Sequence, residues 1–422
     1  MEAIIIIIFV IGYIAITMEH KINLNKAASA LITAALCWTV IMLNPNGVEN
    51  EIKLESLSSH LGEVAGILFF LMSAMTIVEL IDAHDGFDIV TNQINTKSKT
   101  KLVWIIGILA FFLSAVLDNL TTTIVLVSLI KKIIPNRNDK LVFIGMVVIA
   151  ANAGGAWSPI GDVSTTMLWI GGQISASNVI LKTFLASFTC FALPTFIISK
   201  MFNGTIETEN NDIKSIITKE KKIIFWSGLS VLLFVPIFKT ITHLPPYIGI
   251  LLGLGIIWLI SELVHKDKDD EIKDVLTVNY ALKKIDTPSI LFFLGILLAV
   301  ASLQEMNLLK HAAQFLDNYV GNLTAISLII GVLSAIVDNV PIVAAVQQMY
   351  TFPQDHYFWE FMAYCAGTGG SILIIGSAAG VAAMGLEKIE FFWYLKKIGW
   401  LALIGYLAGT GVFILQNTFF HT

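Results

Sequence analysis

Long apolar runs separated by short polar segments occupy nearly the whole chain. A helix needs about 20 apolar residues to cross a bilayer. The pattern predicts ten full membrane spans, at about 3–19, 26–43, 62–83, 139–172, 179–200, 223–241, 246–264, 287–304, 358–385 and 391–416. Two further apolar stretches, about 102–130 and 322–350, are too long for one span and too short for two, and each contains a polar break. We therefore expect an all-α polytopic membrane protein.

Composition and the first segment agree with this class. The 422 residues are 56% hydrophobic and 14% charged, whereas soluble domains are about 45–50% apolar and about 25% charged. Residues 1–18 show neither a basic leader nor a small-residue cleavage site, so they predict a retained span, not a signal peptide. We find no phosphate loop and no metal-ligand spacing, so we expect no cofactor, no ATP-driven engine and no nucleic-acid partner.

The basic residues predict the orientation in the membrane. Six segments contain 22 of the 26 Lys and Arg residues: 20–26, 85–101, 131–140, 200–222, 265–285 and 385–397. Cytoplasmic loops are enriched in these residues, so we expect the six segments to be cytoplasmic and both termini periplasmic, in a bacterial inner membrane. Both ends of 102–130 then lie on one side, which requires a re-entrant helical hairpin enclosed by protein. The stretch 322–350 is its expected counterpart from the opposite side.

Three sequence matches at nearly constant offset indicate an internal repeat. ILFFL occurs at 67–71 and 290–294, and LSAVLDN at 113–119 matches LSAIVDN at 333–339. The third match pairs the glycines Gly154, Gly155 and Gly161 with Gly369, Gly370 and Gly376. Each half then has five full spans and one hairpin, and the odd number of spans inverts the second half. We predict a first repeat at 1–205, a cytoplasmic loop at 206–222 and a second repeat at 223–422, with broken helices at the midplane. Such inverted repeats are typical of secondary transporters.

Asp118 and Asp338 lie near the middle of the two hairpins, followed by Asn119 and Asn339. A carboxylate at the bilayer centre costs about 2.5–3.5 kcal/mol on insertion scales, so such residues commonly mark ion pathways. Capping of a broken helix is the alternative interpretation. Carboxylate and amide oxygens suit a hard cation such as sodium. Because burial favours the protonated carboxyl group, ion and proton would compete for one site.

Glycines and a proline interrupt the spans at 139–172 and 358–385. The first break reads ANAGGAWSPIGDVSTT from 151 to 166, and its counterpart reads GTGGSILIIGS from 367 to 377. Glycine pairs in membrane helices also simply permit close packing, but Asp162 in the first break favours a binding site. The further candidate ligands at the hairpins and breaks are Ser114, Ser334, Asn152, Asp162, Ser164, Thr165, Thr368, Ser371 and Ser377.

Glu63, Asp286 and Glu79 are candidates for a proton path. Glu63 and Asp286 each precede an ILFFL string by four residues. Alternatively, Glu63 and Asp286 are ordinary interface residues at the ends of their spans, and Glu79 is a solvated charge. Since no Lys or Arg lies in the middle of a predicted span, carboxylates are the expected proton carriers.

Four strings carry a family resemblance: LSAVLDNLTTTIV, ANAGGAWSPIGDVSTTM, LSAIVDNVPIVAA and GTGGSILIIGSAAGVAAMG. They resemble the NhaD family of sodium/proton antiporters, and the resemblance covers nearly the whole chain. It implies exchange of sodium or lithium for protons, with sodium held by Asp118, Asn119, Asp338 and Asn339. It also implies a homodimer and an elevator-like movement of the hairpins. Ser164 stands where we would expect threonine, which keeps a hydroxyl group in place.

Other functions stay open at this point. An anion or metalloid carrier of the same superfamily, for arsenite or a dicarboxylate, is the alternative, because arsenite permeases also have Asp-Asn tips. Dicarboxylate symporters carry Ser-Asn-Thr there, which favours a cation for this chain. An intramembrane aspartyl protease needs a GxGD-like motif, whose first glycine is missing before Gly161-Asp162. A channel would not explain the inverted repeats, so we expect a transporter and not an enzyme.

Overall fold

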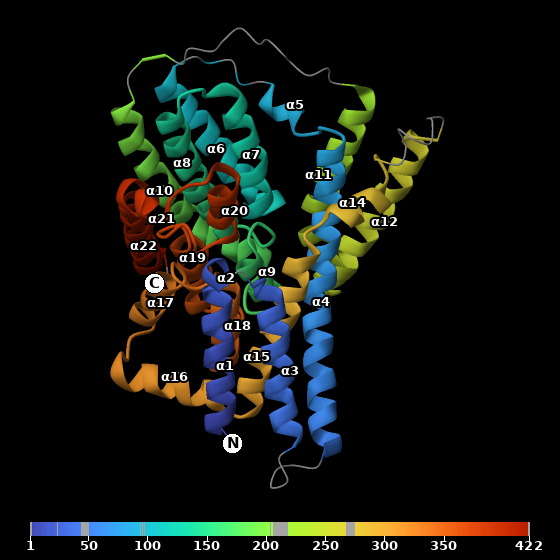
Figure 1. The fold of residues 1–422 in the computed structure, drawn as a ribbon, viewed down its shortest axis with the longest axis vertical. Coiled ribbons are helices and arrows are strands. Elements are labelled where there is room, and N and C mark those ends of the chain that lie inside the picture. The colour runs from blue at the N-terminus through green and yellow to red at the C-terminus, as the bar shows by residue number, and fades with distance from the viewer. Residues whose placement is uncertain are drawn as a thin grey trace.

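The computed structural model describes residues 2–22, 24–43, 50–92, 94, 96, 98–202, 204–205, 218–266 and 275–420. Within these ranges the protein is helical, and its only β pairing is an isolated bridge between Ser98 and Thr205. Most of the predicted loop at 206–222 lies outside the described residues, which resume at 218. Figure 1 shows the arrangement of the helices.

The helices follow the predicted order in both halves. The first half contains α1 (Glu2–Thr17), α2 (Glu19–Ile22), α3 (Lys26–Met42), α4 (Asn50–Ala83), α5 (Asp88–Thr91), α6 (Lys99–Leu117), α7 (Asn119–Ile133), α8 (Arg137–Ala156), α9 (Val163–Ile170) and α10 (Ala176–Met201). The second half contains α11 (Lys219–Thr242), α12 (Pro246–Val264), α14 (Val278–Lys284), α15 (Thr287–Glu305), α16 (Leu308–Tyr319), α17 (Leu323–Leu333), α18 (Asn339–Met349), α19 (Tyr357–Gly369), α20 (Ala378–Glu387), α21 (Phe391–Tyr394), the π-helical turn η1 (Leu395–Gly399) and α22 (Trp400–Phe420).

Helix lengths differ from the predicted spans at three places. Eight helices of the described part are long and apolar enough to cross a membrane. α1 and α3 have 16 and 17 residues, or about 24 and 26 Å, which is less than the roughly 30 Å of a hydrocarbon core. α4 has 34 residues and begins at Asn50, so the predicted start at 62 was wrong. Its polar first turns stay helical, and the Ser56 hydroxyl donates to Glu305 of α15 (2.6 Å).

Two helical hairpins lie on opposite sides of the molecule's centre. Only Asp118 separates α6 from α7, and it has a positive φ of 82°. Residues 334–338 separate α17 from α18. α6 and α7 occupy the upper part of Figure 1, and α17 and α18 the lower part. The sequence pattern did not predict α16, which runs across the bottom of the view and meets α17 at 118°.

The two halves interlock through the hairpins. The first arm of each hairpin packs on the broken span of its own half, α6 on α8 and α17 on α19. The second arm contacts both halves: α7 packs on α8 and α20, and α18 packs on α9 and α19. Every residue from 143 to 156 and from 358 to 369 is buried. The broken spans are therefore enclosed by protein, as their irregular backbone requires.

The same side-chain contact fixes each hairpin to its broken span. The Ser114 hydroxyl donates to the carbonyl oxygen of Ala151 (2.6 Å), and the Ser334 hydroxyl donates to that of Ala366 (2.7 Å). The repeat detected in the sequence is thus reproduced at the level of single hydrogen bonds. These two serines, predicted as ion ligands, hold the first hairpin arms in place.

The repeated glycines permit backbone contact between the hairpins and the broken spans. A Cβ atom on Gly154 would lie 2.2 Å from the Phe111 carbonyl oxygen, and one on Gly369 would lie 2.0 Å from that of Gly331. Helix α8 continues through Gly154 to Ala156, so the expectation that the first glycine pair unwinds the span was wrong. The later glycines do lie in the breaks, where a Cβ atom on Gly161 or Gly376 would also meet hairpin backbone, at 2.6 and 2.5 Å.

Candidate functional site

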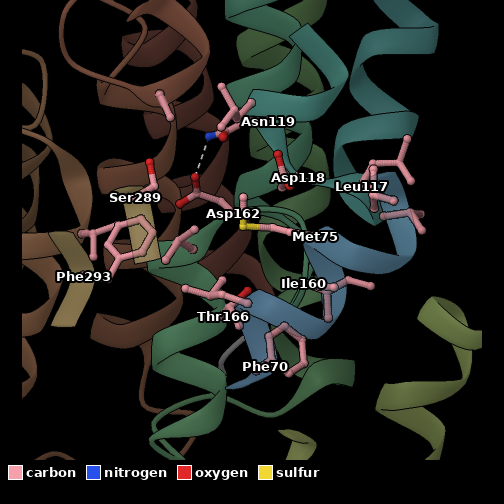
Figure 2. A pocket seen from close by; sticks show the side chains of 18 of the residues that line it. Phe70, Met75, Leu117, Asp118, Asn119, Ile160, Asp162, Thr166, Ser289 and Phe293 are labelled. Atoms are coloured by element: carbon pink, nitrogen blue, oxygen red, sulfur yellow. Dashed lines mark hydrogen bonds between the residues drawn. The ribbon is translucent and has the colours of Figure 1, made fainter. Parts of the chain in front are cut away.

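Asp162 joins the tips of the two hairpins. It caps the N-terminus of α9 and is 2% exposed. Its Oδ1 accepts a hydrogen bond from the Asn119 amide (2.6 Å), and its Oδ2 accepts one from the Asn339 amide (3.0 Å). Figure 2 shows the first of these bonds, with Asp118 close by. One buried carboxylate therefore links both duplicated Asp-Asn pairs.

Asn152 extends this network to the second broken span. Its side-chain oxygen accepts from the Asn119 amide (3.0 Å), and its own amide donates to the Ser377 hydroxyl (2.9 Å). Ser377 caps α20 with φ/ψ of −145°/153°, nearly the −143°/141° of Asp162 at the start of α9. The two residues occupy equivalent backbone positions, as the glycine match predicted, but only Asp162 is charged.

Four helices, α7, α9, α18 and α20, begin at this network. The first N–H groups of a helix have no partner within the helix and carry partial positive charge. Here the chain's own side chains accept from these groups: Asp118 from Thr121 N (2.8 Å), Asp162 from Ser164 N (3.1 Å), Asp338 from Val340 N (3.2 Å) and Ser377 from Gly380 N (3.2 Å). The capping interpretation of the hairpin aspartates is therefore correct, and it coexists with a place in the site.

A cavity of about 80 Å³ lies beside the network. Its polar wall consists of Lys26, Asp118, Asn119, Asp162, Thr166, Ser289, Asp338 and Asn339. Apolar side chains form the rest of the wall; they include Phe70 and Met75 of α4 and Phe293 of α15 (Figure 2), and others come from α6, α11 and α12. The structure thus brings together the four hairpin residues that the sequence singled out, together with Asp162.

Four further predicted ligands do not line the central cavity. Thr368 and Ser371 donate to backbone carbonyls of α19 (2.6 Å each). The Ser164 hydroxyl donates to Asp162. The Thr165 hydroxyl is buried and has no hydrogen-bond partner among the described residues, so it keeps its full capacity to bind.

None of the three candidate proton-path carboxylates lines the central cavity itself, although Asp286 accepts hydrogen bonds from the N–H and the hydroxyl of Ser289, which does. The Glu63 side chain is 68% exposed and lies 3.8 Å from His60. Asp286 caps α15 and accepts from Ser289 N (3.2 Å). Glu79 is half-buried on α4. The structure does not bring these groups to the Asp162 network, and their proposed role stays a prediction.

Lys26 is the functional residue that the sequence analysis missed. The sequence analysis placed it at the end of a basic segment and at the start of the span 26–43, and it did not predict that the side chain lines the central cavity. Its Nζ lies 3.5 Å from Asp338 Oδ2 and 4.5 Å from the centre of the Phe292 ring. Carboxylate and ring face both stabilise the ammonium group there. No local signal could have found this contact, since it joins residues 312 positions apart. Thr166 and Ser289 were also missed.

Residues 13–367 match the CitMHS family, described as citrate transporters. The chain belongs to this family. Among its CitMHS relatives are sodium/proton antiporters 1 and 2 of Arabidopsis thaliana, 47% and 44% identical over 97% and 98% of this chain and 71% and 99% of theirs. The Na(+)/H(+) antiporter NhaD of Alkalimonas amylolytica is 30% identical over 99% of this chain and 91% of its own. The resemblance to the NhaD type is thereby confirmed.

The fold of this CitMHS member is also found in a solved structure. The YdaH transporter of Alcanivorax borkumensis superposes with a TM-score of 0.58 over 93% of this chain and 97% of that one. Only 12% of the residues are identical, so the match shows the fold alone. The protein is thus a multi-pass membrane transporter by family.

Proposed function

We propose that this protein exchanges sodium or lithium for protons across its membrane by alternating access. The observation that carries the proposal is the capping of α7, α9 and α18 by Asp118, Asp162 and Asp338. Free helix N-termini attract anions. Here their N–H groups are already occupied by carboxylates, so the site presents negative charge and suits a cation better than citrate, a dicarboxylate or arsenite.

The size of the cavity supports the same choice. Pockets for organic ligands usually measure about 300–1,000 Å³, whereas the central cavity measures about 80 Å³. That volume suits an ion with a few water molecules. A carboxylate-bearing metabolite would need the hairpins to separate from α4 and α15.

Both tip asparagines are oriented to bind a cation. Each uses its amide nitrogen toward Asp162, which leaves the side-chain oxygen of Asn119 and Asn339 available. Carboxylate, amide and freed backbone oxygens are the ligands that hard cations prefer. We place sodium near Asp118, Asn119, Asp338 and Asn339, with Asp162 between them.

Proton coupling follows from the crowding of carboxylates. Asp118, Asp162 and Asp338 line one small cavity, and repulsion among like charges favours a bound cation or a bound proton there. When sodium leaves, a proton replaces it on one of these three carboxylates. This competition gives exchange, and it needs no separate proton path.

The membrane arrangement belongs to the same proposal. We infer repeats at 1–205 and 223–422, with the six basic segments on the cytoplasmic side of a bacterial inner membrane and both termini on the other side. Because relatives are found in a plant, a plant membrane is the alternative location. A homodimer is the proposed assembly.

Proton-loaded everted vesicles test the function. Adding sodium or lithium should collapse the proton gradient, reported by a pH-sensitive dye, while potassium, arsenite, succinate and citrate should not. Asp118→Asn and Asp338→Asn should each abolish exchange while the protein still inserts and purifies normally. Glu390→Gln, a change at an exposed carboxylate before α21 that makes no capping hydrogen bond, is the control and should exchange normally. A response to an anion and none to sodium or lithium would move the function to an anion carrier.

A further inference from the structure

Lys26 brings a permanent positive charge to one of the two hairpin tips. It is the first residue of α3, and its Nζ lies 3.5 Å from Asp338 Oδ2 over the face of Phe292 from α15. The two side chains of this ion pair are 26% and 22% exposed. Both line the central cavity. The ammonium group therefore occupies a place from which a cation bound at Asp338 would be excluded.

The other hairpin tip has no equivalent. Asp118 corresponds to Asp338 in the repeat, and its oxygens accept from the backbone and hydroxyl of Thr121 (2.8 and 3.1 Å). In the described part of the chain, no Lys or Arg nitrogen lies within 4.0 Å of Asp118. The duplicated tips are thus alike in backbone and in their Asp-Asn pair but differ in charge.

We propose that Lys26 is a tethered counter-ion for Asp338. It neutralises Asp338 while the site holds no sodium, and sodium displaces it on binding. Lys26 thereby sets the apparent sodium affinity of the site. A partly exposed ion pair is weak, so a hydrated ion can break it.

The position of Lys26 also connects two groups of helices. α3 packs on α1 and α15, whereas Asp338 lies at the tip of the hairpin formed by α17 and α18. The Lys26–Asp338 pair is therefore a direct link between that group and the hairpin. Displacement of Lys26 by sodium removes this polar contact, while the packing of α15 on α18 remains.

The first test measures exchange as a function of sodium concentration in the vesicle assay, and it rests on the proposed function. A site that is available for only about one-tenth of the time binds its ligand about tenfold more weakly than a free site. Lys26→Met should therefore lower the half-maximal sodium concentration several-fold, whereas Lys26→Arg should stay close to the wild type. Lys310→Met, on exposed α16, should change nothing. An unchanged half-maximal concentration in Lys26→Met, with or without a lower maximal rate, overturns the proposal.

The second test needs no transport. Purified protein is treated with an amine-reactive reagent in sodium chloride or in choline chloride of equal ionic strength, and labelling of Lys26 and Lys310 is followed by mass spectrometry. Sodium should accelerate labelling at Lys26 only, and Asp338→Asn should label quickly in both salts. If the labelling rate of Lys26 is the same in both salts while vesicles with the same protein exchange sodium, the counter-ion role of Lys26 is rejected and the proposed function stands. Sodium-sensitive labelling without exchange keeps the counter-ion and rejects the function.

Discussion

At the scale of single residues, the two repeats have matching backbone positions in the site but different side chains. Asp162 and Ser377 start α9 and α20 with nearly identical backbone angles. Asp162 accepts hydrogen bonds from the side-chain amides of Asn119 and Asn339, whereas Ser377 accepts one from the amide of Asn152. The two equivalent positions at the centre therefore hold one carboxylate instead of two.

Asp162→Asn should abolish sodium exchange and lower stability. An asparagine can present one oxygen to one amide, so either Asn119 or Asn339 would lose its acceptor, and an unsatisfied buried group costs about 1–3 kcal/mol. The vesicle assay gives the exchange, and thermal unfolding in detergent gives the stability. Ser377→Ala, which removes a neutral cap worth about 1 kcal/mol, is the control and should still exchange. Normal exchange by Asp162→Asn would exclude Asp162 from the ion site.

At the scale of elements, glycines decide how closely the hairpins approach the broken spans. The backbones of α6 and α8 meet at Gly154, and those of α17 and α19 meet at Gly369. Close helix packing through small residues is the usual source of association inside a membrane. The hydroxyls of Ser114 and Ser334 add a hydrogen bond at each contact. The hairpin tips are thereby held at the level of the breaks.

Gly154→Ala should destabilise the protein because its methyl group would lie 2.2 Å from the Phe111 carbonyl oxygen. Forcing atoms into a filled contact typically costs about 1–3 kcal/mol. Gly255→Ala is the matched control, since a Cβ atom at that helical position of α12 meets nothing within 4 Å. Thermal unfolding in detergent should show a lower midpoint for Gly154→Ala only. Equal midpoints would mean that the α6–α8 contact relaxes at no measurable cost.

At the scale of the whole molecule, a second and larger cavity lies beyond α9. It measures about 590 Å³ and is lined by polar groups that include His60, Glu63 and Gln347. Thr166 of α9 faces the central cavity, while Met167 and Ile170 face the larger one. About one turn of α9 therefore separates the candidate site from a polar vestibule.

Cysteine labelling tests the orientation of this vestibule. The native residues Cys37, Cys190 and Cys365 are buried, so single introduced cysteines can be followed. Glu63→Cys should react with a membrane-impermeant maleimide from the side opposite the basic segments. Asn138→Cys, exposed at the start of α8, should react only from the side of the basic segments. Reaction of both from the same side would contradict the predicted orientation.

The sequence by itself determined which polar residues and helix breaks lie within the apolar spans, where they cost free energy. Placing a polar residue in the bilayer costs free energy at any position along the chain. The sequence therefore identified Asp118, Asp338 and the helix breaks before Asp162 and Ser377 against their apolar surroundings. The span order and the repeat were readable for the same reason, because each depends on short stretches of chain. The sequence also identified the repeated glycines. Whether a glycine unwinds its helix or permits backbone contact depends on the neighbouring helix, which the sequence does not specify.

Only the tertiary structure decided how these features meet. The second hairpin arms pack on the opposite half, which places Asn119 and Asn339 on one carboxylate, Asp162. Lys26 resembled a loop residue in the sequence and became part of the site through a contact with Asp338. Such contacts depend on distances between segments far apart in the chain. Local hydrophobicity and residue spacing carry no information about those distances, because neither specifies which distant residue a side chain contacts in the folded protein.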